Sequence, residues 1–320
     1  MKKEISRKFC VAPMMGYTTP YARKLYRILS NNSFLFSEMI ATKSLIYSKS
    51  KNNIIDNDFN NPVALQVGGS EIDELRKASK IAIDYNYDEI NLNVGCPSKA
   101  VQKGSFGACL MRDKILVRNC VEALQNDKIE ATLKCRLGLG RELNYELFDE
   151  FIDEISKSGI KFIYVHARNA ILSGITPQGN RTIPPLSYDY VKKIKNKYPD
   201  ITFILNGGID NLDKAESLLK EFDGVMVGRL IKNNPFILKE VDKKIFKAEA
   251  IRSPFDIADA MRSYIKEHCK KGGKPHQVTR HMIGLFHGLP GSKAWRQCLS
   301  GGSCHRNIDF YDEALLAVTD

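Results

Sequence analysis

The most regular feature of the chain is a series of short runs of apolar and β-branched residues, separated by stretches with helical spacing. Such runs are typical of buried strands. Strands in alternation with helices indicate a parallel sheet, and eight of them predict a (β/α)8 TIM barrel. The expected strands are Phe9–Pro13, Leu35–Ile40, Val63–Val67, Glu89–Val94, Thr132–Arg136, Phe162–His166, Thr202–Asn206 and Gly224–Gly228.

The segments between these strands place apolar residues three and four positions apart, as amphipathic helices do. The segment Ser44–Asn57 is polar and poorly periodic, so the helix expected there is the weakest. The clearest helices are Ile72–Tyr85, Ile115–Leu124, Phe148–Ile155 and Asn211–Leu219, the last of which opens with a residue suited to an N-cap.

The alternation of strands and helices ends near Phe246, and the rest of the chain predicts helices alone. Glycine pairs at 272–273 and 301–302 separate them. We therefore expect a barrel domain over residues 1–246 and a small all-helical domain over residues 247–320. Its helices are expected at Asp256–Cys269, Val278–Phe286, Lys293–Leu299 and Phe310–Val318.

Length and charge are consistent with this division. The chain has 320 residues, and an α/β barrel alone can reach about 250. A formal net charge of +11 favours nucleic acid or an anionic membrane as partner, although a solvated lysine-rich surface gives the same sum. No apolar run approaches the roughly 20 residues of a membrane helix. The first residues have no stretch typical of a secretory signal.

Eight cysteines are spread along the chain, and none forms a C-x-x-C pair. Most lie in apolar contexts. This usage is typical of reduced thiols in a cytoplasmic protein, and it indicates neither a disulfide framework nor a metal site.

Candidate chemistry lies at the expected C-terminal ends of the strands, where barrel enzymes carry their active residues. Lys134, between Leu133 and Cys135, is expected to be buried, and a buried lysine is usually paired or functional. The alternative is a lysine that leans out at the rim. The strand-end set is Pro13, Met14, Met15, Gln66, Asn93, Cys96, Lys134, His166, Asn206, Gly207, Gly208, Gly228 and Arg229.

Glycines follow the last two strands, at Gly207-Gly208 and at Gly228. Barrels often bind phosphate with the loops after these strands, where glycine lets backbone N–H groups approach the anion. Each could be a simple turn, but the position favours a phosphate site. Arg229 or His166 could neutralise the phosphate charge.

Cys96 follows the fourth strand, between Gly95 and Pro97. A free thiol has a pKa of about 8.5, so at neutral pH it is mostly protonated and can deliver a proton. Most cysteines are inert core residues, which explains a rim position less well. A different chemistry also fits the strand ends, with Lys134 as the Schiff-base nucleophile of an aldolase-like barrel.

The helical region is strongly basic. Between Arg262 and Arg306 it holds nine Lys or Arg residues and one acid, and the single Trp295 lies between Lys293 and Arg296. Cations with an interleaved aromatic suit a phosphate backbone and a stacked base. The alternative is a core tryptophan beside a solvated basic face.

Together these residues resemble the bacterial tRNA-dihydrouridine synthases, especially the A-type subfamily specific for positions 20 and 20a of tRNA. The segment from Asn93 through Gly95-Cys96-Pro97 is specific to the family, and Ile183–Leu186 and Arg280–Met282 point to the subfamily. The matching stretches cover nearly the whole chain: Ala12–Met15, Leu92–Ser98, Gly104–Met111, His166–Arg168, Asn180-Arg181, Ile183–Leu186, Asn206–Ile209, Asp223–Arg229 and Thr279–Arg296.

The resemblance implies an FMN enzyme, with NADPH as reductant, that converts uridines of the tRNA D-loop to 5,6-dihydrouridine. Hydride would reach C6 of uracil from reduced FMN, and Cys96 would give the proton to C5. The implied partner is tRNA, with no membrane and no metal, and the expected state is a monomer. The implied flavin contacts are Pro13, Met14, Met15, Gln66, Lys134, His166, Asn206, Gly207, Gly208, Gly228 and Arg229, and the implied RNA contacts are Asn93, Asn180, Arg181, Arg280, Lys293 and Arg296.

The chain departs from the family at Lys99-Ala100, Cys135, Gly138–Glu142 and Gln178. These positions affect the expected loop contacts to tRNA or NADPH more than the flavin site. Two other interpretations remain. One is an FMN barrel that acts on a free pyrimidine, which the basic tail disfavours. The other is a non-catalytic RNA-binding module, which Cys96 and Lys134 disfavour.

Overall fold

The computed structural model describes residues 5–48, 55–57, 61–248, 253–300 and 308–318. Eight strands form one sheet in the order β1-β8-β7-β6-β5-β4-β3-β2, and all paired neighbours are parallel. A bridge from Cys10 to Phe34 joins the two remaining edges and confirms the barrel. The strands are β1 (Phe9–Val11), β2 (Leu35–Ala41), β3 (Val63–Gly68), β4 (Glu89–Asn93), β5 (Glu130–Arg136), β6 (Phe162–His166), β7 (Thr202–Asn206) and β8 (Gly224–Val227).

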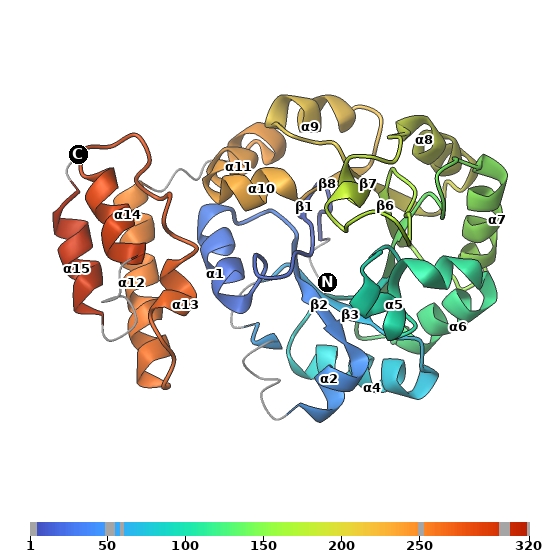
Figure 1. Cartoon of the computed structure of the whole chain (residues 1–320), viewed down its shortest axis with the longest axis horizontal. Coiled ribbons are helices and arrows are strands. Elements are labelled where there is room, and N and C mark those ends of the chain that lie inside the picture. The colour runs from blue at the N-terminus through green and yellow to red at the C-terminus, as the bar shows by residue number, and fades with distance from the viewer. Residues whose placement is uncertain (1–4, 49–54, 58–60, 249–252, 301–307, 319–320) are drawn as a thin grey trace.

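Helices surround the strands as an outer ring (Figure 1). Asn211 caps its helix as expected, since its side chain accepts the backbone N–H of Lys214. The ring contains α1 (Pro20–Leu29), α2 (Thr42–Tyr47), α4 (Ile72–Asp84), α5 (Lys99–Lys103), α6 (Lys114–Leu124), α7 (Tyr145–Ser156), α8 (Tyr188–Lys197), α9 (Leu212–Leu218), α10 (Arg229–Asn233) and α11 (Leu238–Phe246), with short 3-10 turns η1 (Gly107–Arg112), η2 (Gly179–Arg181) and η3 (Pro235–Ile237).

The expected elements of the barrel agree with these bounds within a few residues. The weak helix expected over Ser44–Asn57 is the short α2, and positions 49–54 of that expectation lie outside the described residues.

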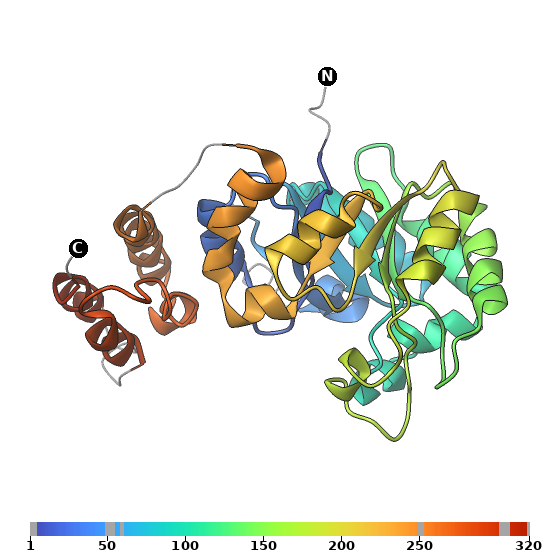
Figure 2. The same cartoon turned by 90° about the horizontal axis from the view of Figure 1, so that it is seen from above.

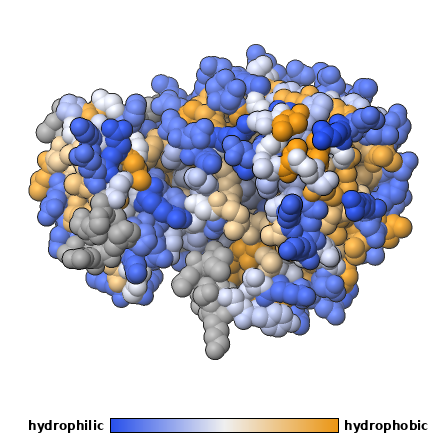
Figure 3. Space-filling view, in the orientation of Figure 1, coloured by the Kyte–Doolittle hydropathy of each residue, from blue (hydrophilic) through white to orange (hydrophobic). Residues whose placement is uncertain are grey.

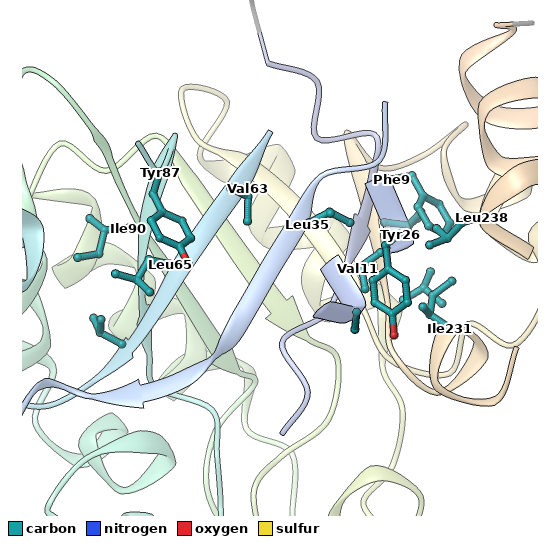
Figure 4. Close-up of a cluster of buried hydrophobic side chains, with 14 of the residues drawn as sticks. Phe9, Val11, Tyr26, Leu35, Val63, Leu65, Tyr87, Ile90, Ile231 and Leu238 are labelled. Atoms are coloured by element: carbon teal, nitrogen blue, oxygen red, sulfur yellow. The ribbon is translucent and has the colours of Figure 1, made fainter. Parts of the chain in front are cut away.

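Residues alternate along each strand between the barrel interior and the helical layer, because successive side chains of a strand point to opposite faces. In β4, Ile90 and Leu92 belong to the large core shared with the helices, and Figure 4 shows Ile90 in this layer. The alternate positions are Glu89, Asn91 and Asn93. Their side chains lie inside the barrel and form hydrogen bonds with Gln66 on β3 and Thr132 on β5. The alternation therefore determines which polar residues reach the interior.

A separate apolar cluster fills part of the barrel. It contains Cys10, Phe34, Phe36, Tyr164 and Met226, all fully buried, together with a few smaller neighbours. The outer core is larger and extends to the helices, as Figure 4 shows for Phe9 and Leu238.

The helices after residue 252 form a bundle beside α1 (Figures 1 and 2). The ring of Tyr21 on α1 lies 4.7 Å from the ring of His268, centroid to centroid, at this junction. We call residues 253–300 and 308–318 the tail. Its helices are α12 (Pro254–Lys270), α13 (His276–Thr279), α14 (Ser292–Ser300) and α15 (Asp309–Leu316).

Trp295 is the centre of the tail's core. Its side chain is fully buried, its Nε1 donates to the Met282 carbonyl at 3.0 Å, and its ring packs on Phe286 and Tyr311. The structure therefore supports the core alternative over a base-stacking role for this tryptophan.

The prediction of one helix in the tail is wrong. Instead of a helix over Val278–Phe286, the structure has the single turn α13 followed by successive turns with i to i+3 hydrogen bonds, such as Met282 N to Thr279 O. Most apolar residues of this stretch are buried, but Gly284 interrupts it and Gly288 follows it.

The described helices include none whose length and apolar character would allow it to cross a bilayer. The last helix of the ring, α11, ends at Phe246, and α12 begins at Pro254. The division into domains at 246/247 stays a prediction.

Candidate active site

Five neighbouring strands each place a polar side chain at the C-terminal end of the barrel interior. They are Gln66 on β3, Asn93 on β4, Lys134 on β5, His166 on β6 and Asn206 on β7. In the sheet register, Asn93 lies opposite Lys134 and His166 lies opposite Asn206. The structure thus brings together five residues that were predicted separately from their strand ends.

Lys134 is held inside this group, and the rim alternative does not apply. Its ammonium nitrogen Nζ donates to Asn206 Oδ1 at 3.1 Å, and Asn206 Nδ2 donates to the Met226 carbonyl at 2.7 Å. Burial, followed by the charge of Arg136, lowers the pKa of Lys134 to about 8.

His166 is surrounded by cations. Burial and the charges of Arg136, Lys134, Arg168 and Arg229 lower its pKa well below the ordinary value, so the imidazole is neutral at pH 7. A neutral imidazole can accept or donate a hydrogen bond without adding charge. Of the two candidates for phosphate neutralisation, Arg229 is therefore the charged one.

Positive charge accumulates here without acidic partners. Within the described ranges, no carboxylate forms an ion pair with Lys134, Arg136, Arg168 or Arg229. Arg168 Nε is buried without a hydrogen-bond partner there. Unneutralised guanidinium and ammonium groups at one rim suit a phosphate.

Neither Arg136 nor Arg168 was identified as a site residue from the sequence. Arg136 donates to the carbonyls of Gly95, Asn169 and Asn180, each at 2.9 Å, and so connects the loops after β4 and β6. The signal was present, because alternation along β5 places Arg136 on the same inward face as Lys134.

The glycines after β7 have a steric reason. Gly207 has φ +113°, and a Cβ there would lie 2.7 Å from His166 Cδ2. Gly208 has φ +67°, and a Cβ there would lie 2.7 Å from Leu186 Cδ2. Both positions therefore require glycine, because a side chain would collide with His166 or Leu186.

The last strand and the first loop complete the flavin set. Gly228 precedes α10, Arg229 is its first residue, and Arg229 donates to the carbonyl of Arg181 at 3.4 Å. In the loop after β1, Met14 packs on the core whereas Met15 is 67% exposed. Pro13 precedes them and is half-buried.

Cys96 lies on the loop after β4 and is half-buried. Its backbone N–H donates to Asn93 Oδ1 at 3.0 Å, and its thiol donates to Ser98 Oγ at 3.6 Å. Its carbonyl accepts the N–H of Ala108 at 2.9 Å. Three contacts thus fix the loop that carries the thiol.

The expected RNA contacts divide into exposed and buried residues. Arg280, Lys293 and Arg296 are exposed on the tail, and Figure 3 shows hydrophilic residues over much of this face of the tail and barrel. Arg181 is half-buried beside Arg229. Asn180 is only 1% exposed, and its amide bonds to Ile171 N–H and the Ile171 carbonyl inside the β6 loop.

Arg280 connects the tail to the barrel. Its NH2 group donates to the Gly16 carbonyl at 3.4 Å, and its Nε donates to His281 Nε2 at 3.2 Å. Gly16 follows Met15, so this arginine reaches the first loop of the candidate site.

The departures from the family lie outside the ring of inward side chains. Cys135 points to the outer core, where burial raises the pKa of its thiol to about 12. The loop Gly138–Glu142 bonds to the β6 loop, for example through Asn169 Nδ2 and the Glu142 carbonyl at 2.6 Å. Lys99 and Ala100 begin α5, and Gln178 precedes η2.

Comparison with known proteins agrees with this geometry. The family model described as "Dihydrouridine synthase (Dus)" matches residues 10–317. The chain is 42% identical over 307 residues to the tRNA-dihydrouridine(20/20a) synthase of Shewanella oneidensis, covering 95% of this chain and 91% of the relative.

Two further relatives carry the same name. The protein of Pseudomonas putida is 40% identical over 93% of this chain and 90% of its own length. That of Escherichia coli K12 is 41% identical over 98% of this chain and 92% of its own length. The identity extends over the barrel and the tail, and the chain belongs to the dihydrouridine synthase family.

Proposed function

We propose that this protein reduces uridines 20 and 20a of tRNA to 5,6-dihydrouridine, with FMN as cofactor and NADPH as reductant. The observation that carries the proposal is the group of cations at the ends of β5 to β8, close to Cys96, with which no carboxylate of the described residues forms an ion pair. Family membership and the names of the relatives support the same reaction. The compartment in which tRNA is modified agrees with the expected cytoplasmic location.

The residues present fit FMN. Arg168 and Arg229 offer unneutralised guanidinium groups to its phosphate, and Gly207 allows the turn after β7 to lie against His166. Gln66, Lys134 and Asn206 present polar groups along the same rim. Pro13, Met14, Met15, Gly208 and Gly228 complete the proposed contacts.

The steps of the proposed reaction are shared between FMN and residues of the chain. When bound and reduced by NADPH, FMN supplies a hydride for C6 of uracil. Cys96 transfers the proton of its thiol to C5, so that hydride and proton together saturate the C5–C6 bond. The Lys134 ammonium stabilises negative charge that develops in the site. The uracil must leave the RNA stack to reach the barrel interior.

The RNA contacts are proposed with two kinds of role. The phosphate backbone is contacted by Arg280, Lys293, Arg296 and Arg181. Their guanidinium or ammonium groups are exposed or half-buried at the rim and on the tail. Asn180 shapes the β6 loop from inside, since its amide is fully used within that loop. The tail orients the tRNA.

The test is to map dihydrouridine in tRNA from a strain that lacks the gene and from strains complemented with variants. Wild type should restore the modification at positions 20 and 20a. Cys96→Ala should not, since general acid catalysis contributes about 10²–10⁴-fold. In vitro, this variant should still bind FMN and be reduced by NADPH.

Cys109→Ala is the matched control, because Cys109 is a second half-buried thiol that the proposal does not use. It should restore the modification fully. Dihydrouridine that persists at both positions in the deletion strain would overturn the proposed function, and normal activity of Cys96→Ala would remove Cys96 as the proton donor.

A further inference from the structure

An unbroken line of buried polar side chains runs through the barrel to the proposed uracil site. β4 contributes Glu89, Asn91 and Asn93 at alternate positions, β3 contributes Gln66, and β5 contributes Thr132. All five side chains are at most 7% exposed. Barrel interiors are usually filled by bulky branched residues, so a polar line of this length needs a reason.

The hydrogen bonds of this line all run in one direction. Asn93 Nδ2 donates to Gln66 Oε1 at 2.9 Å, and Gln66 Nε2 donates to Asn91 Oδ1 at 2.8 Å. Asn91 Nδ2 donates to Thr132 Oγ1 at 2.7 Å, and Thr132 Oγ1 donates to Glu89 Oε1 at 2.6 Å.

Both ends of the line fix this direction. At the lower end, burial raises the pKa of Glu89, but the ion pair with Arg7 at 2.8 Å opposes this shift and favours the carboxylate, which can only accept. At the upper end, Asn93 Oδ1 accepts the backbone N–H of Gly95 at 3.2 Å and of Cys96 at 3.0 Å, and a backbone N–H can only donate. Reversing any amide between these ends would oppose two donors or two acceptors.

The Asn93 side chain has only one hydrogen-bonding group left for a ligand. An amide oxygen has two lone pairs, and both are used by Gly95 and Cys96. One of the two amide hydrogens is used by Gln66. A single N–H remains, so Asn93 can donate to a ligand but cannot accept from one.

We propose that this makes Asn93 the residue that distinguishes uracil from cytosine. Its remaining N–H donates to O4 of uracil, whereas cytosine carries an exocyclic amine at C4 and would present a donor to a donor. Gln66, Asn91, Thr132 and Glu89 are positioning residues that hold Asn93 in this state. The inference rests on the proposed function and specifies how its site selects the base.

Asn93→Asp tests the selection. An aspartate keeps the size and can still accept from Gly95 and Cys96, but it offers an acceptor where the asparagine offered a donor. Two tRNA transcripts with uridine or cytidine at positions 20 and 20a would be titrated onto FMN-loaded enzyme without NADPH. Wild type should prefer uridine by about tenfold, the value of one hydrogen bond to a matched group. Asn93→Asp should lose or invert that preference.

Thr132→Val tests the positioning line. It removes the hydroxyl that accepts from Asn91 and donates to Glu89, three hydrogen bonds away from Asn93. The uridine preference should fall toward unity, and Thr132→Ser, which keeps the hydroxyl, should restore it. Asn91→Asp breaks the same line at constant volume should the valine variant not fold. Thr202→Val, the same substitution on β7 and outside the line, is the control and should keep the wild-type ratio.

The outcomes separate the two proposals. Wild-type enzyme that forms no dihydrouridine refutes the proposed function. Wild type that forms dihydrouridine and prefers uridine, with an unchanged preference in Asn93→Asp, refutes the selection by Asn93. An unchanged preference in both Thr132→Val and Asn91→Asp refutes the positioning line, because Gly95 and Cys96 would then orient Asn93 alone.

Discussion

Among single residues, Lys134 has the most direct link between burial and a measurable property. Burial disfavours the charge of its ammonium, Arg136 adds a like charge, and together they lower its pKa to about 8. An anionic ligand at the rim favours the charged form and raises this pKa again. Ligand binding above pH 8 must therefore be accompanied by proton uptake.

We expect the affinity of the apoprotein for FMN to be constant below pH 8 and to fall above it. The limiting slope is about tenfold per pH unit, which corresponds to one proton. Flavin fluorescence titrations between pH 7 and pH 9 would measure the fall. Lys134→Gln should bind more weakly at pH 7 and show no break near pH 8. The same break in this variant would assign the titration to another group.

The sequence predicted residues whose role depends on strand position, and missed those whose role depends on tertiary contacts. Lys134 and Asn206 could be named because each lies near the C-terminal end of a barrel strand. Asn180 looked like an RNA contact, but its amide is used by Ile171 within a folded loop. Trp295 could be a base platform or a core residue, and only the packing of Phe286 and Tyr311 decided between them.

At the level of elements, the turn after β7 is constrained by both backbone and space. Gly207 has a left-handed φ, and its missing Cβ leaves room for the ring of His166 on β6. The short loop therefore keeps two neighbouring strand ends close together.

Gly207→Ala should weaken FMN binding by at least about tenfold, because the ring of His166 must move for the new Cβ and the backbone is strained by about 1–3 kcal/mol. Gly159→Ala is the matched control, since Gly159 has φ +75° and a Cβ added there would meet nothing within 4 Å. Both variants should lose stability in thermal melts. Equal FMN affinities of the two would mean that strain alone acts and that the site tolerates the Cβ.

Strands were easier to predict than the tail. Parallel strands are buried on both faces, so they appear in the sequence as continuous apolar runs and can be recognised without a regular alternation of polar and apolar residues. The turns after α13 are equally apolar, and periodicity does not distinguish a buried turn series from a buried helix. Glycines 284 and 288 were the available signal, because glycine weakens a helix by about 1 kcal/mol.

At the level of the whole molecule, the residues proposed to contact FMN and some of those proposed to contact RNA lie in different regions. Every residue proposed to contact FMN lies between Pro13 and Arg229, whereas Lys293 and Arg296 lie on α14 of the tail. Only the junction at α1 and Arg280 links the two regions among the contacts described above. The sequence indicated a separate helical region, but its position beside α1 depends on contacts that no local pattern encodes.

This separation predicts that the two half-reactions can be uncoupled. Lys293 and Arg296 are exposed and three residues apart, so they lie close together on the surface of α14, whereas Trp295 and Leu299 are buried. Replacing both with alanine should weaken tRNA binding and lower the slope of log affinity against log salt by about two units, one for each phosphate contact. FMN content and NADPH oxidation should be unchanged.

The control is the double alanine variant of Lys77 and Lys80, which are exposed at the same spacing on α4. It removes the same net charge from a helix on another side of the barrel (Figure 1). A general charge effect would lower affinity equally in both variants, because long-range attraction depends on net charge. Specific phosphate contacts lower the slope only for the α14 pair. Equal slopes for the α14 variant and wild type would mean that this basic face is merely solvated, and the tRNA would then have to dock through Arg181, Arg229 and the barrel rim.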